Sequence, residues 1–556
     1  MNREIDFYKL YEYSVEVHHD ELGSVGRAKL TFGNGKWPNL KFEGGFDGAF
    51  GSPKLVDGQK YERIKVVSDT GEIFTLFDFE YRLFSSHADF LAEGDIEAKF
   101  KKIYVRYADI SEWFMRGQYI QGYLTETLTW VNKPEAIQVE VKTTNEHFSL
   151  VTEVRSTSEK TGENLVINEH VIFEFEKLNG LFGVADVRAK CLELSNFISI
   201  LIACPFSIVS VGVGGEKGEF GYGYFPSFKK VERGSREFSW VDCLMQKRML
   251  DGRWQAAFEN YYKSEHREVV LARLAGMQRY DSFWEYKALG YISLLDKVVK
   301  KKSHGVRAEV VLPSQDKLDA FNRAVEGVAE KFTDSQKAEM VNIINKVFSW
   351  KDRTFAKNFK NAVASADARV IKVINISDDD FSFIKGVRDD IAHGHKIDLG
   401  GSGHDRVSQV VNKVTLLLTY WAFLEFGLTS DDFIACLKGS HNPLAHNPGL
   451  NRVYLERITG MSDFYEVSEE RFKQIEAIKG SQIQACFTRD SNGEIEYSEK
   501  YTQMFKDWMR QGKSGVMRPF DMFGIEDSKV KCSGTAYLES GEKKMRLHHV
   551  YVIDDR

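Results

Sequence analysis

The sequence predicts an α+β multidomain protein: a β-rich, sandwich-like N-terminal domain, then an all-α helical bundle, then a small mixed C-terminal region. Two patterns indicate this order. Apolar and polar residues alternate in short runs over the first ~240 residues, and apolar residues at helical spacing dominate the part that follows. The length of 556 residues suits about three domains. The predicted domains are 1–245, 246–438 and 439–556.

Composition is that of a globular protein and excludes a polycation. Hydrophobic residues make up 43% and charged residues 28%, and the formal net charge is −6, so a nucleic-acid site must be a local basic patch. The N-terminus lacks an apolar signal core. The apolar stretch 197–213 is too short to span a membrane, and it contains Pro205. It predicts a buried helix, a break and a buried strand, and we expect a cytoplasmic protein without membrane contact.

The strands of the N-terminal domain are predicted from alternation with a period of two. Alternating apolar positions are Ala28, Leu30 and Phe32; Ile103, Val105 and Tyr107; Ile137, Val139 and Val141; and Val171, Phe173 and Phe175. Turn residues such as Gly33-Asn34-Gly35 separate the runs. One apolar face per strand favours antiparallel sheets, packed as a sandwich or an open barrel.

Helices are predicted next, from apolar periodicity and end signals. The expected ranges are 248–264, 266–302 as one or two helices, 315–350 with a break, 355–364, 378–393 and 405–426. Within 266–302, an apolar stripe comprises Phe283, Trp284, Leu289, Ile292, Leu295 and Val298. Ser377 with Asp380 is a capping-box start, and Gly394 is a typical helix end. The strongly apolar segment 405–426 suits the centre of a bundle.

The C-terminal region has mixed patterns. Helices are expected over 468–478 and 499–510, and a hairpin over 530–538 and 544–553. His441 and His446 lie in repeated His-Asn-Pro turns without nearby cysteine or carboxylate support, so turn formation is favoured over a metal site. Neither a metal nor a cofactor is expected.

Arg388 and His393, near the end of the predicted helix 378–393, are candidate catalytic residues. An arginine offers a permanent charge and a planar set of donors that suit phosphate, and a histidine exchanges a proton near neutral pH. RNA supplies its own 2′-hydroxyl as nucleophile, so this pair could cleave RNA without a metal. The products would be a 2′,3′-cyclic phosphate and a 5′-hydroxyl. Asp389, one helical turn before His393, could orient the imidazole by a hydrogen bond.

A purely structural interpretation must be weighed against this chemistry. A histidine at a helix end often caps carbonyls and interacts favourably with the helix dipole. The spacing of Arg388 and His393 alone favours that interpretation. The surrounding sequence favours the catalytic one.

Residues 386–394, Gly-Val-Arg-Asp-Asp-Ile-Ala-His-Gly, resemble the HEPN signature, in which a short spacer separates an arginine from a histidine. Asp389 stands where that family has a polar residue, often asparagine. Helices precede the motif and a long apolar helix follows it, so the resemblance extends over the predicted bundle. A β-rich region followed by such a bundle resembles the ApeA-like group of bacterial anti-phage proteins, and the stretch 24–46 is loosely similar to the start of that group's N-terminal domain.

The resemblance implies an activity and partners. HEPN nucleases are metal-independent endoribonucleases, so it implies 2′-hydroxyl transesterification on host RNA, tRNA included, during abortive infection. It also implies a homodimer through the helical domain, in which the motifs of two protomers face each other. A phage-derived trigger is a further implied partner.

A local basic segment agrees with RNA binding. Between residues 342 and 376, seven basic residues stand against two acidic ones. The candidate RNA-binding residues are Lys351, Arg353, Lys357, Lys360, Arg369 and Lys372. Phosphate contacts from such clusters dominate nucleic-acid affinity. A solvated basic face is the alternative interpretation.

Two other functions stay open. The bundle could be a non-catalytic HEPN module that binds RNA or protein. The β-rich domain could be carbohydrate-active or ligand-sensing, with the bundle as a dimerisation element, although nothing in it identifies the close carboxylate pair that glycoside hydrolysis needs.

Overall fold

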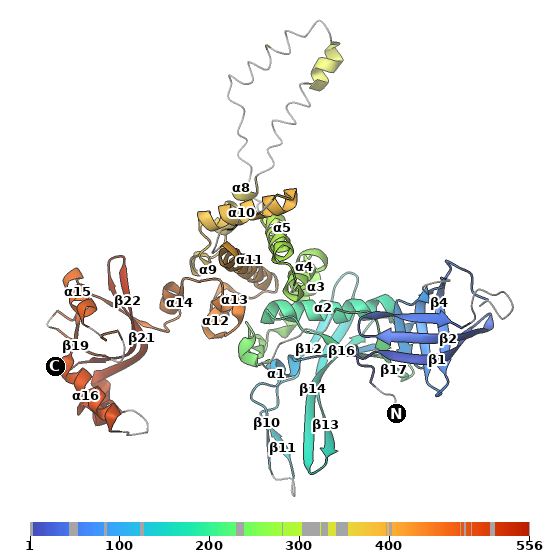
Figure 1. Ribbon diagram of the computed structural model, residues 1–556, viewed down its shortest axis with the longest axis horizontal. Coiled ribbons are helices and arrows are strands. Elements are labelled where there is room, and N and C mark those ends of the chain that lie inside the picture. Colours follow the sequence, from blue (N-terminus) through green and yellow to red (C-terminus); the bar gives the residue numbers. More distant parts are fainter. Residues whose placement is uncertain are drawn as a thin grey trace. The chain divides into compact units, whose positions relative to one another are not determined.

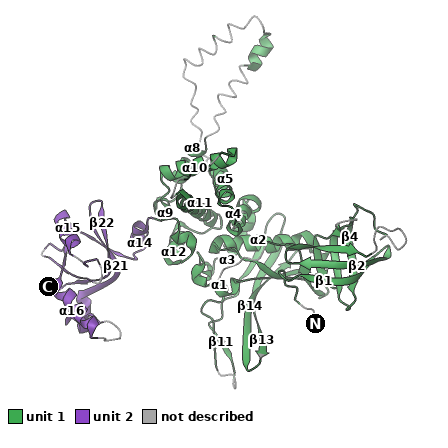
Figure 2. Cartoon of the chain, viewed as in Figure 1, with its two compact units in different colours: residues 1–450 green, residues 451–556 purple. Residues whose placement is uncertain are grey.

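The computed structural model describes the chain except for a set of short segments. These are 1–3, 44–53, 83–85, 123–126, 229–237, 281, 303–322, 324–331, 341–353, 396, 398, 400–402, 479, 483–484, 491, 512–517 and 555–556. The chain divides into two compact units, Met1–Leu450 and Asn451–Arg556 (Figure 2). The predicted β-rich and helical regions both lie in the first unit, and the predicted three-domain division stays a prediction.

The first unit begins with a thirteen-stranded antiparallel sheet (Figure 1). In sheet order its strands are β12 (Gln138–Lys142), β13 (His147–Thr161), β14 (Asn164–Lys177), β9 (Lys102–Tyr107), β16 (Ile208–Gly214), β17 (Phe220–Tyr224), β7 (Phe90–Glu93), β5 (Ile73–Glu80), β4 (Lys60–Ser68), β1 (Tyr11–His19), β2 (Gly23–Gly33), β3 (Lys36–Phe42) and β6 (Ser86–His87). Strand β6 pairs with both β3 and β5. The strands from β5 to β6 therefore close into a small barrel, and the β-rich prediction is confirmed.

The predicted alternation explains why these strands form. Every apolar position named for β2, β9, β12 and β14 is buried. Ala28 and Leu30 lie opposite Val15 and Tyr13 of β1, which fixes one face of the barrel core. At the β2–β3 turn, Asn34 adopts a left-handed φ of 51° between two glycines, a conformation that suits these residue types.

Smaller elements complete the β-rich region. They are α1 (Ile110–Phe114), the pair β8 (Lys99–Phe100) and β15 (Phe182–Gly183), the pair β10 (Tyr119–Gln121) and β11 (Thr129–Val131), and α2 (Val184–Ile202). The predicted sequence of buried helix, break at Pro205 and buried strand is confirmed by α2 and β16. The Tyr107 hydroxyl donates a hydrogen bond of 2.6 Å to the carbonyl of Cys191, which ties α2 to β9.

The rest of the first unit is helical. Its helices are α3 (Trp254–Lys263), a π-helical turn (Arg267–Leu271), α4 (Ala272–Arg279), α5 (Trp284–Lys302), α8 (Phe355–Ala364), α9 (Ala368–Ile374), α10 (Asp378–His393), α11 (Gly403–Glu425), α12 (Ser430–Gly439) and α13 (Pro443–His446). The predictions for 355–364 and 378–393 are confirmed residue for residue, and that for 405–426 to within two residues. The predicted helix 315–350 lies largely outside the described residues.

Two helix predictions are wrong in detail. The range 248–264 is not one helix, because Gly252 adopts a left-handed φ of 72° that no α-helix accommodates; a 3₁₀ turn (Lys247–Leu250) precedes it and α3 follows it. The predicted apolar stripe also begins too early. Phe283 lies before α5 and is 67% exposed, whereas Ile292 and Leu295 are buried.

The long apolar helix α11 is central, as predicted. It is buried along most of its length and packs against α5, α9, α10, α12 and α13. Helix α10 contacts both α5 and α11 (Figure 1). This three-helix arrangement positions Arg388 and His393, which lie on α10.

The second unit is a small mixed fold. Its elements are α14 (Arg452–Ile458), β18 (Asp463–Glu466), α15 (Glu469–Ala477), β19 (Cys486–Arg489), β20 (Ile495–Tyr497), α16 (Glu499–Arg510), α17 (Pro519–Phe523), β21 (Val530–Ser540) and β22 (Lys543–Ile553). The predicted helices and terminal hairpin are confirmed. Strands β18 and β19 add to the hairpin in parallel. Among the described residues of either unit, no helix has the length and apolar character to cross a bilayer.

Candidate functional site

Local sequence fixes both ends of α10. The Ser377 hydroxyl accepts a hydrogen bond from the Asp380 amide at 3.0 Å, and the Asp380 carboxylate accepts one from the Ser377 amide at 3.4 Å, so the predicted capping box is confirmed. At the other end, Gly394 has a left-handed φ of 69°. The His395 amide donates to the carbonyl of Asp390 at 2.9 Å, as in a glycine-terminated helix. His393 is therefore the last residue of α10.

A buried ion pair anchors the start of the same helix to α11. The Lys413 ammonium lies 2.8 Å from the Asp380 carboxylate and 2.7 Å from the carbonyl of Asn375. Burial alone would raise the pKa of Asp380, but Lys413 lowers it below its ordinary value. The orientation of α10 against α11 thus depends on a charge pair that is largely removed from water.

Arg388 lies at the edge of the apolar face of α10. Phe381, Ile384 and Val387 are buried on that face, and the Arg388 side chain is 30% exposed. Its Nη1 lies 2.9 Å from Oδ1 of Asp389, and its Nη2 lies 3.4 Å from Oδ2 of Asp296 on α5. Two carboxylates, one from each helix, therefore hold the guanidinium in place.

Asp389 differs from its predicted role. Its carboxylate contacts Lys385 at 3.0 Å and Arg388 at 2.9 Å, and no hydrogen bond joins it to His393 within the described part of the chain. Burial would raise the pKa of Asp389, but these two cations lower it. The expected orientation of His393 by Asp389 is thus replaced by orientation of Arg388, because a lysine one turn earlier competes for the carboxylate.

The His393 side chain is exposed. Its ring centroid lies 5.7 Å from that of His395, and no hydrogen bond or ion pair engages it among the residues that the structure describes. Its ring nitrogens are therefore accessible to a ligand. On an ideal helix, residues five apart are rotated by about 140°, so one α10 presents Arg388 and His393 to different sides.

An open cavity of about 610 Å³ adjoins the end of α10. It is lined by Trp284 and Glu285 of α5, by Ile391, Gly394 and His395, and by Ile397, Leu399 and His404. The sequence did not indicate this cavity, because its walls come from segments far apart in the chain.

The candidate RNA-binding residues differ in whether carboxylates already pair with them. Arg369 contacts Asp367 at 2.8 Å and Asp431 at 2.7 Å, and these two carboxylates raise the pKa of Arg369. Lys360 forms an exposed ion pair of 3.3 Å with Asp378. Lys357 and Lys372 are exposed on α8 and α9. Lys351 and Arg353 lie outside the described residues.

Within the described part of the chain, no group of three or more histidine, cysteine or carboxylate residues is placed to hold a metal. The His441 and His446 rings lie 5.9 Å apart, and Nε2 of His446 lies 3.1 Å from the carbonyl of Ser440. This contact suits the turn formation predicted for the two His-Asn-Pro segments.

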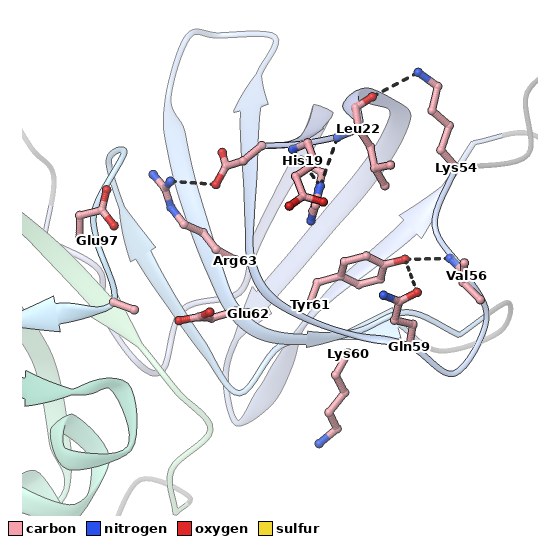
Figure 3. A pocket seen from close by; sticks show the side chains of 13 residues that line it. His19, Leu22, Lys54, Val56, Gln59, Lys60, Tyr61, Glu62, Arg63 and Glu97 are labelled. Carbon is pink, nitrogen blue, oxygen red and sulfur yellow. Dashed lines mark hydrogen bonds and ion pairs between the residues drawn. The ribbon is translucent and has the colours of Figure 1, made fainter.

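An open pocket of about 540 Å³ lies on the barrel (Figure 3). Several of its polar groups are already paired. Arg63 pairs with Asp20 at 3.2 Å, Nδ1 of His19 accepts hydrogen bonds from the turn that follows it, and the Tyr61 hydroxyl accepts one from the amide of Val56. The end of α10 is the stronger candidate site, because it carries both Arg388 and the exposed His393.

Comparison with known proteins concerns the N-terminal part of the chain. Residues 26–261 match the family model described as ApeA N-terminal domain 1. The matched range covers most of the barrel, the other strands of the thirteen-stranded sheet, α2 and most of α3. It ends before α4. Neither the curated proteins nor the solved structures compared with the chain gave a match. The family match agrees with the predicted resemblance of the N-terminal region and supports an ApeA-like anti-phage protein.

Proposed function

We propose that the protein is a metal-independent endoribonuclease of the HEPN type, which cleaves host RNA, tRNA included, in anti-phage abortive infection. The observation that carries the proposal is the placement of Arg388 and His393 on the last turns of one capped helix, where both reach solvent. The ApeA match supports the defence context.

The chemistry follows from the two side chains. His393 takes the proton from the 2′-hydroxyl of the RNA, and the resulting oxyanion attacks the adjacent phosphorus. The bond from phosphorus to the 5′-oxygen breaks, and the leaving oxygen takes a proton from solvent water, which gives a 2′,3′-cyclic phosphate and a 5′-hydroxyl. Arg388 neutralises the charge that grows on the phosphate oxygens, and one well-placed donor of this kind contributes about 3–4 kcal/mol. Asp296 and Asp389 act as positioning residues for Arg388.

A homodimer completes the proposed site. Because Arg388 and His393 are turned about 140° from each other on α10, one helix directs them to different sides. Two copies related by a twofold axis would bring the arginine of one protomer towards the histidine of its partner. The proposal thus implies that activity requires the dimer.

We place this encounter in the cytoplasm, where host RNA and phage products meet. The ApeA-type N-terminal region is the candidate receptor for a phage-derived trigger, since it is separate in sequence from the helices that carry Arg388 and His393.

The direct test is cleavage of total cellular RNA by the purified full chain in the presence of EDTA. The wild type is expected to give fragments with 2′,3′-cyclic phosphate ends, and Arg388→Ala and His393→Ala are expected to lose at least a hundredfold in rate. His441→Ala is the matched control, an exposed histidine outside the site. Cleavage by His393→Ala at the wild-type rate, or a strict need for a divalent metal, would contradict the proposal.

A non-catalytic module that binds RNA or protein is the second candidate. The pairing of Arg388 with two carboxylates favours it, because a phosphate must compete with both. Tight RNA binding in a gel-shift assay, with RNA that stays intact after long incubation with the dimer, would select this candidate.

A further inference from the structure

The cavity at the end of α10 has the position of a substrate subsite. It is lined by the first turn of α5, by the end of α10, and by Ile397, Leu399 and His404, and it measures about 610 Å³. This volume falls within the usual range for small-molecule and cofactor pockets. His395 lines it, and the centroid of the His395 ring lies 5.7 Å from that of His393. A group held in this cavity would therefore lie on the His395 side of the phosphate on which His393 acts.

The walls of the cavity include an ordered aromatic pair. The rings of Trp284 and His404 meet edge to face, with centroids 5.2 Å apart and an interplanar angle of 89°. Two further aromatic residues within two positions of Trp284 are exposed, Phe283 by 67% and Tyr286 by 61%. Their ring centroids lie 6.2 Å apart, and adjoining exposed apolar side chains can mark a contact site. Single-stranded nucleic acids stack their bases on such rings.

Glu285 is the carboxylate in the cavity lining, which also includes His395 and His404. Its side chain is partly buried, and no described residue forms a hydrogen bond or ion pair with it. An ionised carboxylate only accepts hydrogen bonds, so it recognises a ligand edge made of donors. The Watson–Crick edge of guanine offers two adjacent donors, N1–H and the N2 amino group, which match the two carboxylate oxygens.

We propose that this cavity binds the base of a nucleotide that flanks the scissile phosphate, and that Glu285 selects guanine at this position. The proposal rests on the proposed ribonuclease function. Trp284 provides the stacking surface, Glu285 reads the two guanine donors, and Phe283 and Tyr286 guide neighbouring unpaired bases. Other bases are disfavoured, because each leaves at least one oxygen of the Glu285 carboxylate without a donor. Each also buries one of its own acceptor atoms against that oxygen.

The test is sequencing of the cut ends after the purified full chain digests a pool of random RNA oligonucleotides. The wild type is expected to show guanine enriched roughly 5- to 100-fold at one position next to the cut, the range that a bidentate contact gives. Glu285→Gln presents a donor to guanine and is expected to reduce the enrichment to below about twofold, while the pool is still cut. Trp284→Phe should keep the preference, and Trp284→Ala should weaken it.

The matched control is Glu268→Gln, a glutamate with an 81% exposed side chain outside the cavity, which should keep the wild-type preference. Cutting that depends on His393 but shows no guanine preference at either flanking position overturns the base-pocket proposal and leaves the ribonuclease proposal intact. The base-pocket proposal is also overturned if the guanine preference persists in Glu285→Gln, or if Glu285→Gln cuts no RNA at all. Cutting that persists in His393→Ala overturns the ribonuclease proposal instead.

Discussion

The guanidinium of Arg388 on α10 is joined to the carboxylate of Asp296 on α5, with Nη2 3.4 Å from Oδ2. The two residues are 92 positions apart in the chain, and their side chains are about one third exposed. A second carboxylate, from Asp389, holds the other terminal nitrogen. The arginine is thus oriented from two sides before any ligand arrives, and preorganised donors of this kind are the ones that stabilise developing charge most effectively.

Asp296→Ala is expected to lower the rate of RNA cleavage about tenfold while leaving the affinity for RNA nearly unchanged. The guanidinium would lose one of its two anchors and sample more orientations. Asp296→Asn keeps a hydrogen-bond acceptor and should lose less. Single-turnover cleavage at saturating protein measures the rate, and unchanged thermal unfolding excludes a merely structural effect. An Asp296→Ala protein as fast as the wild type would remove Asp296 from the mechanism.

Asp380→Ala should destabilise the first unit by about 3–5 kcal/mol, because it leaves the buried Lys413 ammonium without its carboxylate. It also removes half of the capping box of α10. Asp379→Ala is the matched control, since Asp379 is exposed on the same first turn and should cost less than about 1 kcal/mol. Urea unfolding followed by tryptophan fluorescence compares the two variants, and equal losses would contradict this account of the anchor.

Acid should weaken the contact between the start of α3 and α12. Hydrogen bonds from Arg253, at 2.8 Å, lower the pKa of Asp432 from 3.8 to about 2, against the effect of burial. Because the pKa is depressed in the folded state, the stabilisation is complete above pH 3.8 and is lost as the pH falls towards 2.

Asp432→Asn is therefore expected to cost about 1–3 kcal/mol near neutral pH, and the difference from the wild type should shrink below pH 3.8. Thermal unfolding from pH 7 to pH 2 measures this dependence. A constant difference across that range would show that the charge of Asp432 is not what stabilises the contact.

Lys360 and Arg369 should contribute unequally to RNA binding. The carboxylates of Asp367 and Asp431 already occupy Arg369, whereas the ion pair of Lys360 is exposed on both sides and is worth little. In the His393→Ala background, Lys360→Ala is expected to reduce the slope of log affinity against log salt by about 0.7, the value for one phosphate contact on a single strand. Arg369→Ala should leave the slope nearly unchanged. A larger change in slope for Arg369→Ala than for Lys360→Ala would show that the RNA does not pass along Lys360.

The sequence predicted elements whose signals are local. Helix α10 was placed residue for residue because Ser377 and Asp380 cap its start and Gly394 ends it. The strands of the barrel followed from alternating burial. The closure of the barrel could not be foreseen, because it depends on β6, which is only two residues long and pairs with β3 and β5.

The candidate site was predicted only in its local part. Arg388 and His393 could be singled out because they lie in one short motif. Asp296, Trp284 and Glu285 reach the site by the packing of α5 on α10, and no pattern in the sequence indicates that packing. The role expected of Asp389 changed for the same kind of reason, since the competing lysine at position 385 decides which cation its carboxylate contacts.

The central claim is that Arg388 and His393 carry out RNA cleavage. The most direct measurement is the sequencing of RNA ends from phage-challenged cells that produce either the wild type or His393→Ala at equal protein levels. We expect new 2′,3′-cyclic phosphate ends at discrete sites with the wild type and none above background with the variant. The same ends at the same abundance in both strains would contradict the claim.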